Sequence, residues 1–203
     1  MGIVQPGIPK KECEFLKKNL NLNIFIEGGT YYGDTAKYAS EIFEKVFTIE
    51  KSKTIYEKIK NLSFKDNVKL LGGDTRDYLD KITFENDNIL YWLDSHWSGG
   101  ETYGEDDECP LLEELKIIFN YKKNFVILID DARLFLAPPP LPHKIENWPI
   151  IREITNVTPK DYEILIYDDV IYIINKDYKF LLWSYFQGRH SRKNRLRSFF
   201  TDF

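Results

Sequence analysis

The chain has 203 residues, of which 43% are hydrophobic and 30% are charged, so it suits one folded domain and excludes a disordered chain. Its formal net charge is −4. Five basic residues against one acidic residue give residues 189–203 a local charge of +4, which leaves −8 on the rest. An acidic body argues against nucleic acid as the main partner. No apolar run has membrane-spanning length, and Cys13 and Cys109 form no metal or disulfide pattern, so we expect a cytoplasmic protein.

Short apolar runs alternate with segments of helical periodicity over the first two-thirds of the chain. Buried strands are predicted at residues 23–27, 47–50, 68–71, 89–93 and 125–129. Between the first two strands, one face of a helix is marked by Ala39, Ile42, Phe43 and Val46. Continuously apolar strands that alternate with helices are typical of a parallel sheet with helices on both faces.

The pattern changes after Ala132, where a proline-rich loop (134–148) and a short helix near 149–154 follow. Strands are predicted at 163–167 and 170–174, and the two residues between them can only form an antiparallel hairpin. This ending is unlike that of most dinucleotide-binding folds. The predicted fold class is α/β and Rossmann-like, with a mostly parallel seven-stranded sheet that ends in an antiparallel hairpin. We expect a single domain made of an N-terminal segment (1–22), a core (23–183) and a solvated, frayed basic tail (184–203).

The loop after the first strand combines an acidic residue, three glycines and the start of a helix. Glycines let the backbone turn sharply and approach a ligand, and an acidic residue at a strand end suits a cationic ligand group. The spacing is neither GxGxxG nor a P-loop, and a plain turn is the alternative interpretation. The binding candidates of this loop are Glu27, Gly28, Gly29, Thr30, Tyr32, Gly33 and Thr35.

Two further acidic residues end the next two predicted strands. Glu50 lies 21 residues beyond Gly29, where a carboxylate can hold two ribose hydroxyls. Asp74 follows the third strand, at a position that faces adenine in nucleoside sites of this architecture. A solvated glutamate and a turn-forming aspartate are the alternatives. Because the strand ends meet at one edge of the sheet, these residues and their neighbours Lys51 and Thr75 are predicted to line one crevice.

Three aspartates and one histidine follow the fourth and fifth strands. Neighbouring strands lie about 4.8 Å apart, so Asp94, Asp130 and Asp131 can share one Mg²⁺ ion. Such an ion would lower the pKa of a bound substrate hydroxyl. Alternatively, Asp130 and Asp131 cap a loop or pair with Arg133. His96 is a candidate general base beside Asp94, although a structural role is the alternative.

Other polar and aromatic residues near these loops carry weaker signals. The acidic run at 105–108 is predicted to be a solvated face. Tyr31, Tyr32 and Trp97 are candidates to line a ligand pocket, since aromatic faces attract cations. Trp92 lies inside a strand and is expected in the core.

Six runs within residues 23–155 carry a resemblance to a known family, namely FIEGGTYYGDTAKYA, FTIEKS, GGDTRDYL, YWLDSHWSGGETYG, CPLLEEL and VILIDDARLF. Together they resemble a family of small bacterial-type class I methyltransferases that depend on S-adenosylmethionine (SAM). The resemblance implies the class I methyltransferase fold, with SAM as cofactor. It places Glu27 and Gly29 in the family's first motif, Glu50 on the ribose and Asp74 beside the adenine, and Asp94 joins the cofactor-binding and catalytic candidates.

The sequence is more distantly similar to metal-dependent O-methyltransferases of the catechol and macrolide-sugar types. Asp94, Asp130 and Asp131 fall on the Mg²⁺ positions of those enzymes, but Ser95 and His96 stand where the catechol type has a lysine. This similarity implies methylation of a small hydroxylated acceptor such as a sugar or glycan, with the acceptor pocket built by 1–22 and 134–148.

Several alternatives to this interpretation stay open at the level of sequence. The first is a metal-independent methyltransferase with His96 as the base. The others are a nicotinamide-dependent oxidoreductase and a nucleoside-binding module without catalysis. A homodimer is also expected, through the aromatic residues Phe180, Trp183, Tyr185 and Phe186.

Overall fold

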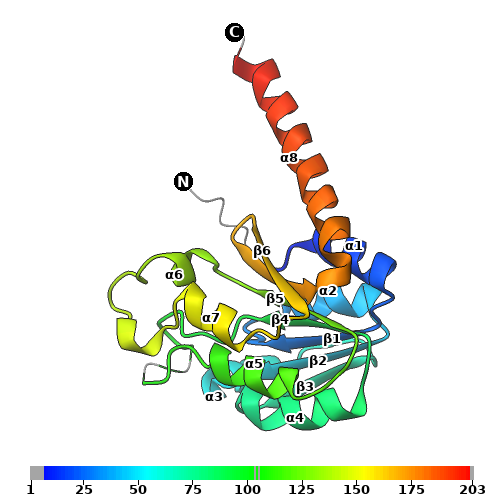
Figure 1. The fold of residues 1–203 in the computed structure, drawn as a ribbon. Helices are drawn as coiled ribbons and strands as arrows, with labels where there is room; N and C mark the ends of the chain where they lie inside the picture. The colour runs from blue at the N-terminus through cyan, green and yellow to red at the C-terminus, as the bar shows by residue number, and fades with distance from the viewer. Residues whose placement is uncertain (1–6, 103, 105, 202–203) are drawn as a thin grey trace.

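Seven strands form one sheet in the computed structural model, which describes residues 7–102, 104 and 106–201 (Figure 1). The strands are β1 (Ile24–Gly28), β2 (Lys45–Glu50), β3 (Val68–Gly72), β4 (Ile89–Leu93), β5 (Phe125–Ile129), β6 (Tyr162–Tyr167) and β7 (Val170–Asn175). Their order is β3-β2-β1-β4-β5-β7-β6, and β7 runs antiparallel to both of its neighbours. The predicted fold class, a mostly parallel sheet ending in a hairpin, is confirmed.

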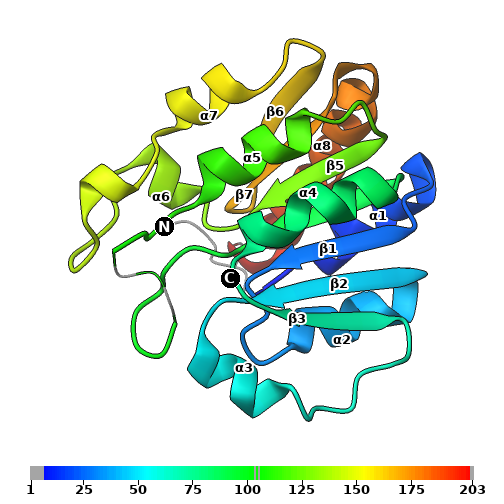
Figure 2. The ribbon, with the colours of Figure 1, turned by 90° about the horizontal axis from the view of Figure 1, so that it is seen from below.

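Helices cover both faces of the sheet, as the apolar strands predict. They are α1 (Lys10–Leu20), α2 (Asp34–Ile42), α3 (Lys53–Ile59), α4 (Thr75–Glu85), α5 (Leu111–Phe119), α6 (Arg133–Leu136), α7 (Ile151–Val157) and α8 (Lys179–Thr201), with 3-10 turns at Ile145–Asn147 and Lys176–Tyr178. One core packs α4, α5 and α7 on one face, and a second packs α1, α2 and α8 on the other (Figure 2). Every residue of β1, β4 and β5 is buried between these layers.

The strand order reverses between β1 and β4. β1 pairs with β2 on one side and with β4 on the other, and both pairings are parallel. The loops that leave β1 and β4 therefore begin side by side at the carboxyl edge of the sheet. Ligands of open α/β sheets bind at such a reversal, so the fold alone predicts a ligand-binding site at this edge.

The first predicted helix ends earlier than its apolar pattern indicates. α2 ends at Ile42, Phe43 is already extended with φ −101° and ψ 150°, and Val46 is a buried residue of β2. Val46 continues the helical spacing of Ala39, Ile42 and Phe43 but also begins the buried run of β2, so periodicity alone cannot find the boundary. The Glu44 N–H donates to the Asn23 carbonyl, and this bond turns the chain into β2.

The basic tail is helical rather than frayed. α8 continues for 23 residues to Thr201 and projects away from the sheet (Figure 1), and the predicted boundary at residue 183 falls inside it. Its first half is anchored, because Leu182 and Phe186 are buried and the Arg189 guanidinium lies 2.5 Å from the Glu12 carboxylate. The side chains beyond residue 192 lie outside the described ones. Within the described chain, no helix is long and apolar enough to cross a membrane.

Candidate active site

A cavity of about 430 Å³ opens at the carboxyl edge of the sheet, where the strand order reverses. It is bounded by the loops that follow β1 to β4 and by the segment 98–102. Six of the predicted cofactor residues line it, namely Gly29, Glu50, Lys51, Asp74, Thr75 and Asp94. His96 and Tyr31 also line it, so the structure brings the strand-end residues together as the sequence predicts.

The other cofactor candidates of the first loop do not line this cavity: Glu27, Gly28, Thr30, Tyr32, Gly33 and Thr35. Glu27 is 1% exposed and accepts a hydrogen bond of 2.5 Å from the Thr48 hydroxyl. Burial raises the pKa of Glu27 to about 8, against the lowering effect of that bond and with a further increase from Asp94. The Thr30 and Thr48 hydroxyls lie 2.6 Å apart, so this group supports the loop from below.

Gly29 is required for the close approach of two loops. Its φ is +88°, and a Cβ at this position would lie 2.1 Å from the Asp94 carbonyl oxygen. No L side chain fits there, because both the backbone conformation and the space exclude it. The absence of a side chain therefore lets the loop after β1 lie against the loop after β4, with the cavity between them.

Glu50 is held with both carboxylate oxygens on backbone amides. Oε2 accepts from the Tyr31 N–H at 2.9 Å, and Oε1 accepts from the Ser52 N–H at 2.7 Å. Burial raises the pKa of Glu50, and these N–H groups act against the increase. A carboxylate has about four acceptor sites, so the fixed group, which lines the cavity, retains acceptor capacity beyond these two amides.

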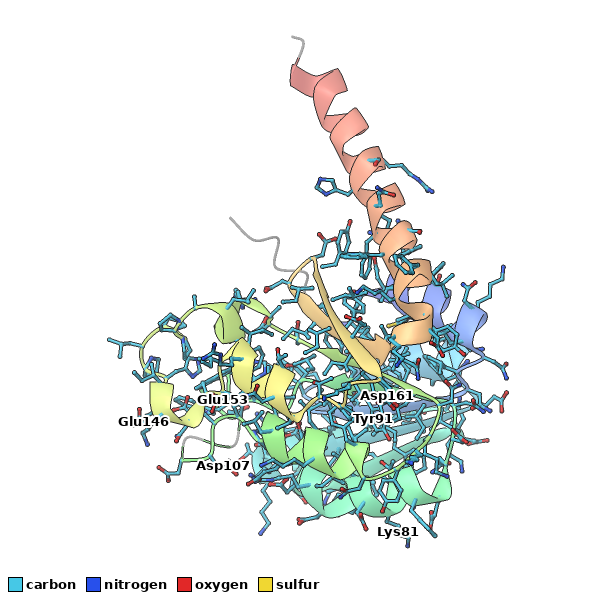
Figure 3. All side chains as sticks on the ribbon, in the orientation of Figure 1. Lys81, Tyr91, Asp107, Glu146, Glu153 and Asp161 are labelled. Atoms are coloured by element: carbon cyan, nitrogen blue, oxygen red, sulfur yellow. The ribbon has the colours of Figure 1, made fainter. Side chains whose placement is uncertain are left out.

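Asp74 lines the cavity at the predicted position and also has a structural role, because it is the N-cap residue of α4. Its side chain caps α4 by accepting from the Arg76 N–H at 2.9 Å, and it lies 2.7 Å from the Lys51 ammonium. Burial would raise the pKa of Asp74, but hydrogen bonds from Arg76 and Lys51 hold it well below its usual range. Asp107, labelled in Figure 3, pairs with the same two cations from the loop before α5.

His96 lies between two of the three predicted metal ligands. Its Nδ1 is 3.6 Å from Asp94 Oδ1 and its Nε2 is 3.4 Å from Asp131 Oδ2, while 7% of its side chain is exposed. Burial would lower the pKa of His96, but these carboxylates raise it. Burial also raises the pKa of Asp94 to about 6 and that of Asp130 to about 8. The two loops thus form one coupled acid–base cluster.

The same cluster shows how the predicted Mg²⁺ ligands are engaged. Asp131 also pairs with Arg133 at 2.7 Å, and Asp130 accepts from the Asp131 N–H at 2.8 Å. Over the described ranges, no group of three or more His, Cys, Asp or Glu side chains is arranged to hold a metal ion. The residues therefore take the loop-capping and ion-pairing roles that were the alternative, and the donor set does not fit Mg²⁺ in this arrangement.

Glu108 is a functional candidate that the sequence interpretation missed. It was predicted on a solvated acidic face, but it is fully buried. Its carboxylate accepts from the Lys144 N–H at 2.9 Å and the Trp148 indole at 2.6 Å, and it lies 3.0 Å from His143 Nδ1. Burial would raise the pKa of Glu108, but these bonds hold it below its usual value. Of the same run, Glu105 lies outside the described residues and Asp106 is exposed.

Glu114 is a second buried acid at the site that the sequence interpretation did not single out. It is 1% exposed and accepts a hydrogen bond of 2.6 Å from the Ser95 hydroxyl. Burial raises the pKa of Glu114 to about 7. A signal was present, because Glu114 falls on the same helical face as Leu111, Leu115 and Ile118. The residue fixes the loop that carries His96.

The aromatic candidates divide between the core and the cavity. Trp92 is fully buried, as predicted, and Trp97 is 9% exposed. The rings of Tyr31 and Tyr32 are in contact with centroids 4.1 Å apart but are tilted by 51°, and both side chains are exposed. Of these two tyrosines only Tyr31 is a lining residue of the cavity, so one predicted aromatic wall is present.

The sheet order and the single antiparallel strand match solved methyltransferases. The O-methyltransferase TomG of Streptomyces achromogenes, involved in tomaymycin synthesis and solved with SAM, is 12% identical, and the match covers 85% of this chain and 82% of that chain with a TM-score of 0.57. The chain has the class I methyltransferase fold. The O-methyltransferase of Bacillus cereus, solved with S-adenosylhomocysteine (SAH), is 13% identical over the same shares of the two chains, with a TM-score of 0.57. No protein-family model and no curated protein matches the sequence.

Proposed function

We propose that this protein is a SAM-dependent methyltransferase. The observation that carries the proposal is Glu50, a carboxylate fixed by two backbone amides at the edge where the class I methyltransferase fold reverses its strand order. Gly29 brings the adjoining loop against Asp94 and leaves a cavity between them. A nucleoside with a cationic tail suits a cavity lined by strand-end acids.

The lining residues divide the cofactor among them in this proposal. Glu50 accepts the two ribose hydroxyls, and Asp74 with Thr75 lies on the adenine side. Gly29 and Asp94 border the opposite end, where the ligand's amino group and sulfonium are held. Glu27 does not touch the ligand in this proposal, because it is buried against Thr48 and does not line the cavity; it supports the loop after β1.

We further propose O-methylation with His96 as the general base. When bound, SAM supplies a methyl group on a positively charged sulfur. His96 lines the cavity beside Asp94, and the two flanking carboxylates orient its ring and stabilise the imidazolium that forms when it takes the hydroxyl proton. Positioning of the two reactants supplies most of the remaining rate.

The metal-independent form of this reaction is favoured by the position of His96. The imidazole lies between Asp94 and Asp131, and the Asp131 carboxylate also forms an ion pair with Arg133. No step of the proposed mechanism passes through Mg²⁺. Activity that survives EDTA supports this form, and activity that is lost in EDTA and restored by Mg²⁺ supports the metal-dependent alternative.

The acceptor in this proposal is a small hydroxylated molecule such as a sugar or glycan. Support comes from the polar groups beside His96 and from the indole of Trp97, which is partly accessible next to them. Polar side chains around an aromatic ring suit a ligand that carries several hydroxyl groups on an apolar frame.

Two expectations about assembly and location belong to the proposal as well. Phe180 is 73% exposed and Trp183 is 51% exposed on α8, so these two can pack a second copy, whereas Phe186 is buried within the chain. Light scattering after size exclusion tests the dimer, which Trp183→Ser should weaken. We also propose a cytoplasmic location, which the free thiols of Cys13 and Cys109 support.

Calorimetric titration with SAM and SAH tests the cofactor. Micromolar binding that weakens at least about tenfold in Glu50→Ala, a loss of about 1.4 kcal/mol, supports the proposal. Glu57→Ala is the matched control, because Glu57 pairs with Lys60 at the surface of α3. Binding of a nicotinamide cofactor in place of SAM would favour the oxidoreductase, and SAM binding without transfer to any acceptor would favour the binding module.

A further inference from the structure

A second cavity, of about 470 Å³, adjoins the first on the side of α6. His96 and Ser98 line both cavities, so the two spaces meet at the candidate base. The far wall comes from α6 and from the proline-rich segment 137–143. We call this space the side chamber. In addition to His96 and Ser98, its lining includes Trp97, Asp131, Arg133, Ala137, Pro140 and His143.

The wall of the side chamber is anchored by buried contacts. Glu108 holds the segment after Pro140 through His143, the Lys144 N–H and Trp148. The Trp97 and His143 rings meet edge to face with centroids 5.3 Å apart, and the Trp97 N–H donates to the Glu108 carbonyl at 2.7 Å. A fully buried carboxylate with three partners gives this wall a defined position, which a binding site needs.

The charges around the side chamber disfavour an anionic occupant. Arg133 is paired with Asp131 and with Asp169 of the β6–β7 turn. Asp94 adds a third carboxylate beside His96 and Glu108 a fourth beside His143, whereas burial raises the pKa of Asp130 to about 8 and so keeps its carboxyl largely protonated near neutral pH. These four carboxylates stand near three groups that can carry positive charge, Arg133, His96 and His143. The carboxylates outnumber the cations whether or not the two imidazoles are protonated, so a further negative charge would meet net repulsion.

We propose that the side chamber binds the methyl acceptor and selects neutral hydroxylated molecules over anionic ones. This inference rests on the proposed methyltransferase function. The acceptor enters beside the proline-rich segment and places its hydroxyl at His96, where the two cavities meet. The hydroxyl oxygen bonds to the methyl carbon of SAM as the carbon–sulfur bond breaks, the electron pair stays on sulfur, and the proton goes to His96.

A pair of adjacent tryptophan substitutions tests the location. Ala137 is an exposed residue that lines the side chamber in an extended conformation with φ −142°, so Ala137→Trp can place an indole over this space without backbone strain. Leu136→Trp is the matched control, since Leu136 is 55% exposed and lies outside the chamber wall. We expect SAM affinity within twofold of wild type in both variants. Methyl transfer should fall at least about 100-fold in Ala137→Trp only.

Matched acceptors test the selectivity. The panel is methyl glucoside with methyl glucuronide, and hydroxybenzyl alcohol with hydroxybenzoate, each measured by SAH formation. The neutral member of a methylated pair should react at least about tenfold faster, a difference of about 1.4 kcal/mol. Asp169→Asn removes one carboxylate and should narrow that ratio several-fold.

The outcomes separate this inference from the proposed function. A wild type that binds no SAM overturns both. SAM binding with no methylation in the panel overturns the proposed O-methylation of small hydroxylated acceptors and this inference with it, whereas full transfer by Ala137→Trp overturns only the side chamber as the acceptor site. An anionic member that reacts as fast as its neutral partner overturns the charge selection.

Discussion

The two sides of the crevice hold their acids in different ways. On the β2 side, Glu50 is fixed by backbone N–H groups, which keep their positions whatever the protonation state nearby. On the β4–β5 side, Asp94 and Asp131 are held by side chains, His96 and Arg133, which can exchange partners. Under the proposed function, this difference suits the first side to holding a ligand that stays the same and the second to proton transfer.

The largest expected effect comes from removing the imidazole of His96, the group on the β4–β5 side that can exchange partners. His96→Gln should lower the rate of methyl transfer about 10²- to 10⁴-fold, because it removes the base. SAM affinity should change less than threefold, since Glu50 is untouched. His190→Gln on the exposed face of α8 is the control. A His96 variant with the wild-type rate would rule out its role as base.

Next in size is the contact that joins the two sides. Gly29→Ala forces a Cβ against the Asp94 carbonyl and should destabilise the fold by roughly 3 kcal/mol or more. Gly99→Ala is matched in φ, at +85°, but its Cβ would meet nothing within 4 Å, so roughly 1 kcal/mol is expected. Thermal unfolding measures both. Equal losses would show that backbone conformation, not the close approach, sets the cost.

A smaller effect is expected at the wall of the side chamber. Glu108→Gln places an amide where three donors meet and should cost roughly 1–3 kcal/mol of stability. It should raise the acceptor KM and leave SAM affinity unchanged. Asp106→Asn, whose side chain is 99% exposed, is the control. An unchanged KM would separate Glu108 from acceptor binding.

The remaining effect is confined to stability and concerns pH and Glu27. Its pKa is about 8 in the folded chain against an ordinary 4.5, so the folded state holds the proton more tightly. Stability therefore falls as pH rises from about 4.5 to about 8 and then levels off. Glu27→Gln lacks this dependence, and its melting temperature should gain on wild type by about 7 to 14 °C between pH 5 and pH 8. Melting temperatures that change equally with pH in wild type and Glu27→Gln would contradict the raised pKa of Glu27.

Sequence reasoning found the sheet and the strand-end residues, because a buried strand followed by a polar residue is a local pattern. Glu50, Asp74, Asp94 and His96 are each placed by such a pattern. Glu108 was missed because its partners lie 35 to 40 residues further along the chain, so nothing local marks it as buried. The end of α2 was missed because Val46 fits either a helix face or a strand.

The contact between Gly29 and Asp94 has a consequence for ligand order. Since the two loops touch through backbone atoms, a ligand that shifts the first loop also shifts the peptide that positions Asp94 and the neighbouring His96. Two ligands that bias one shared element have a coupling free energy, and that energy is the same in either direction. Under the proposed function, an acceptor that acts through this contact changes the affinity for SAM by the same factor by which SAM changes the affinity for the acceptor.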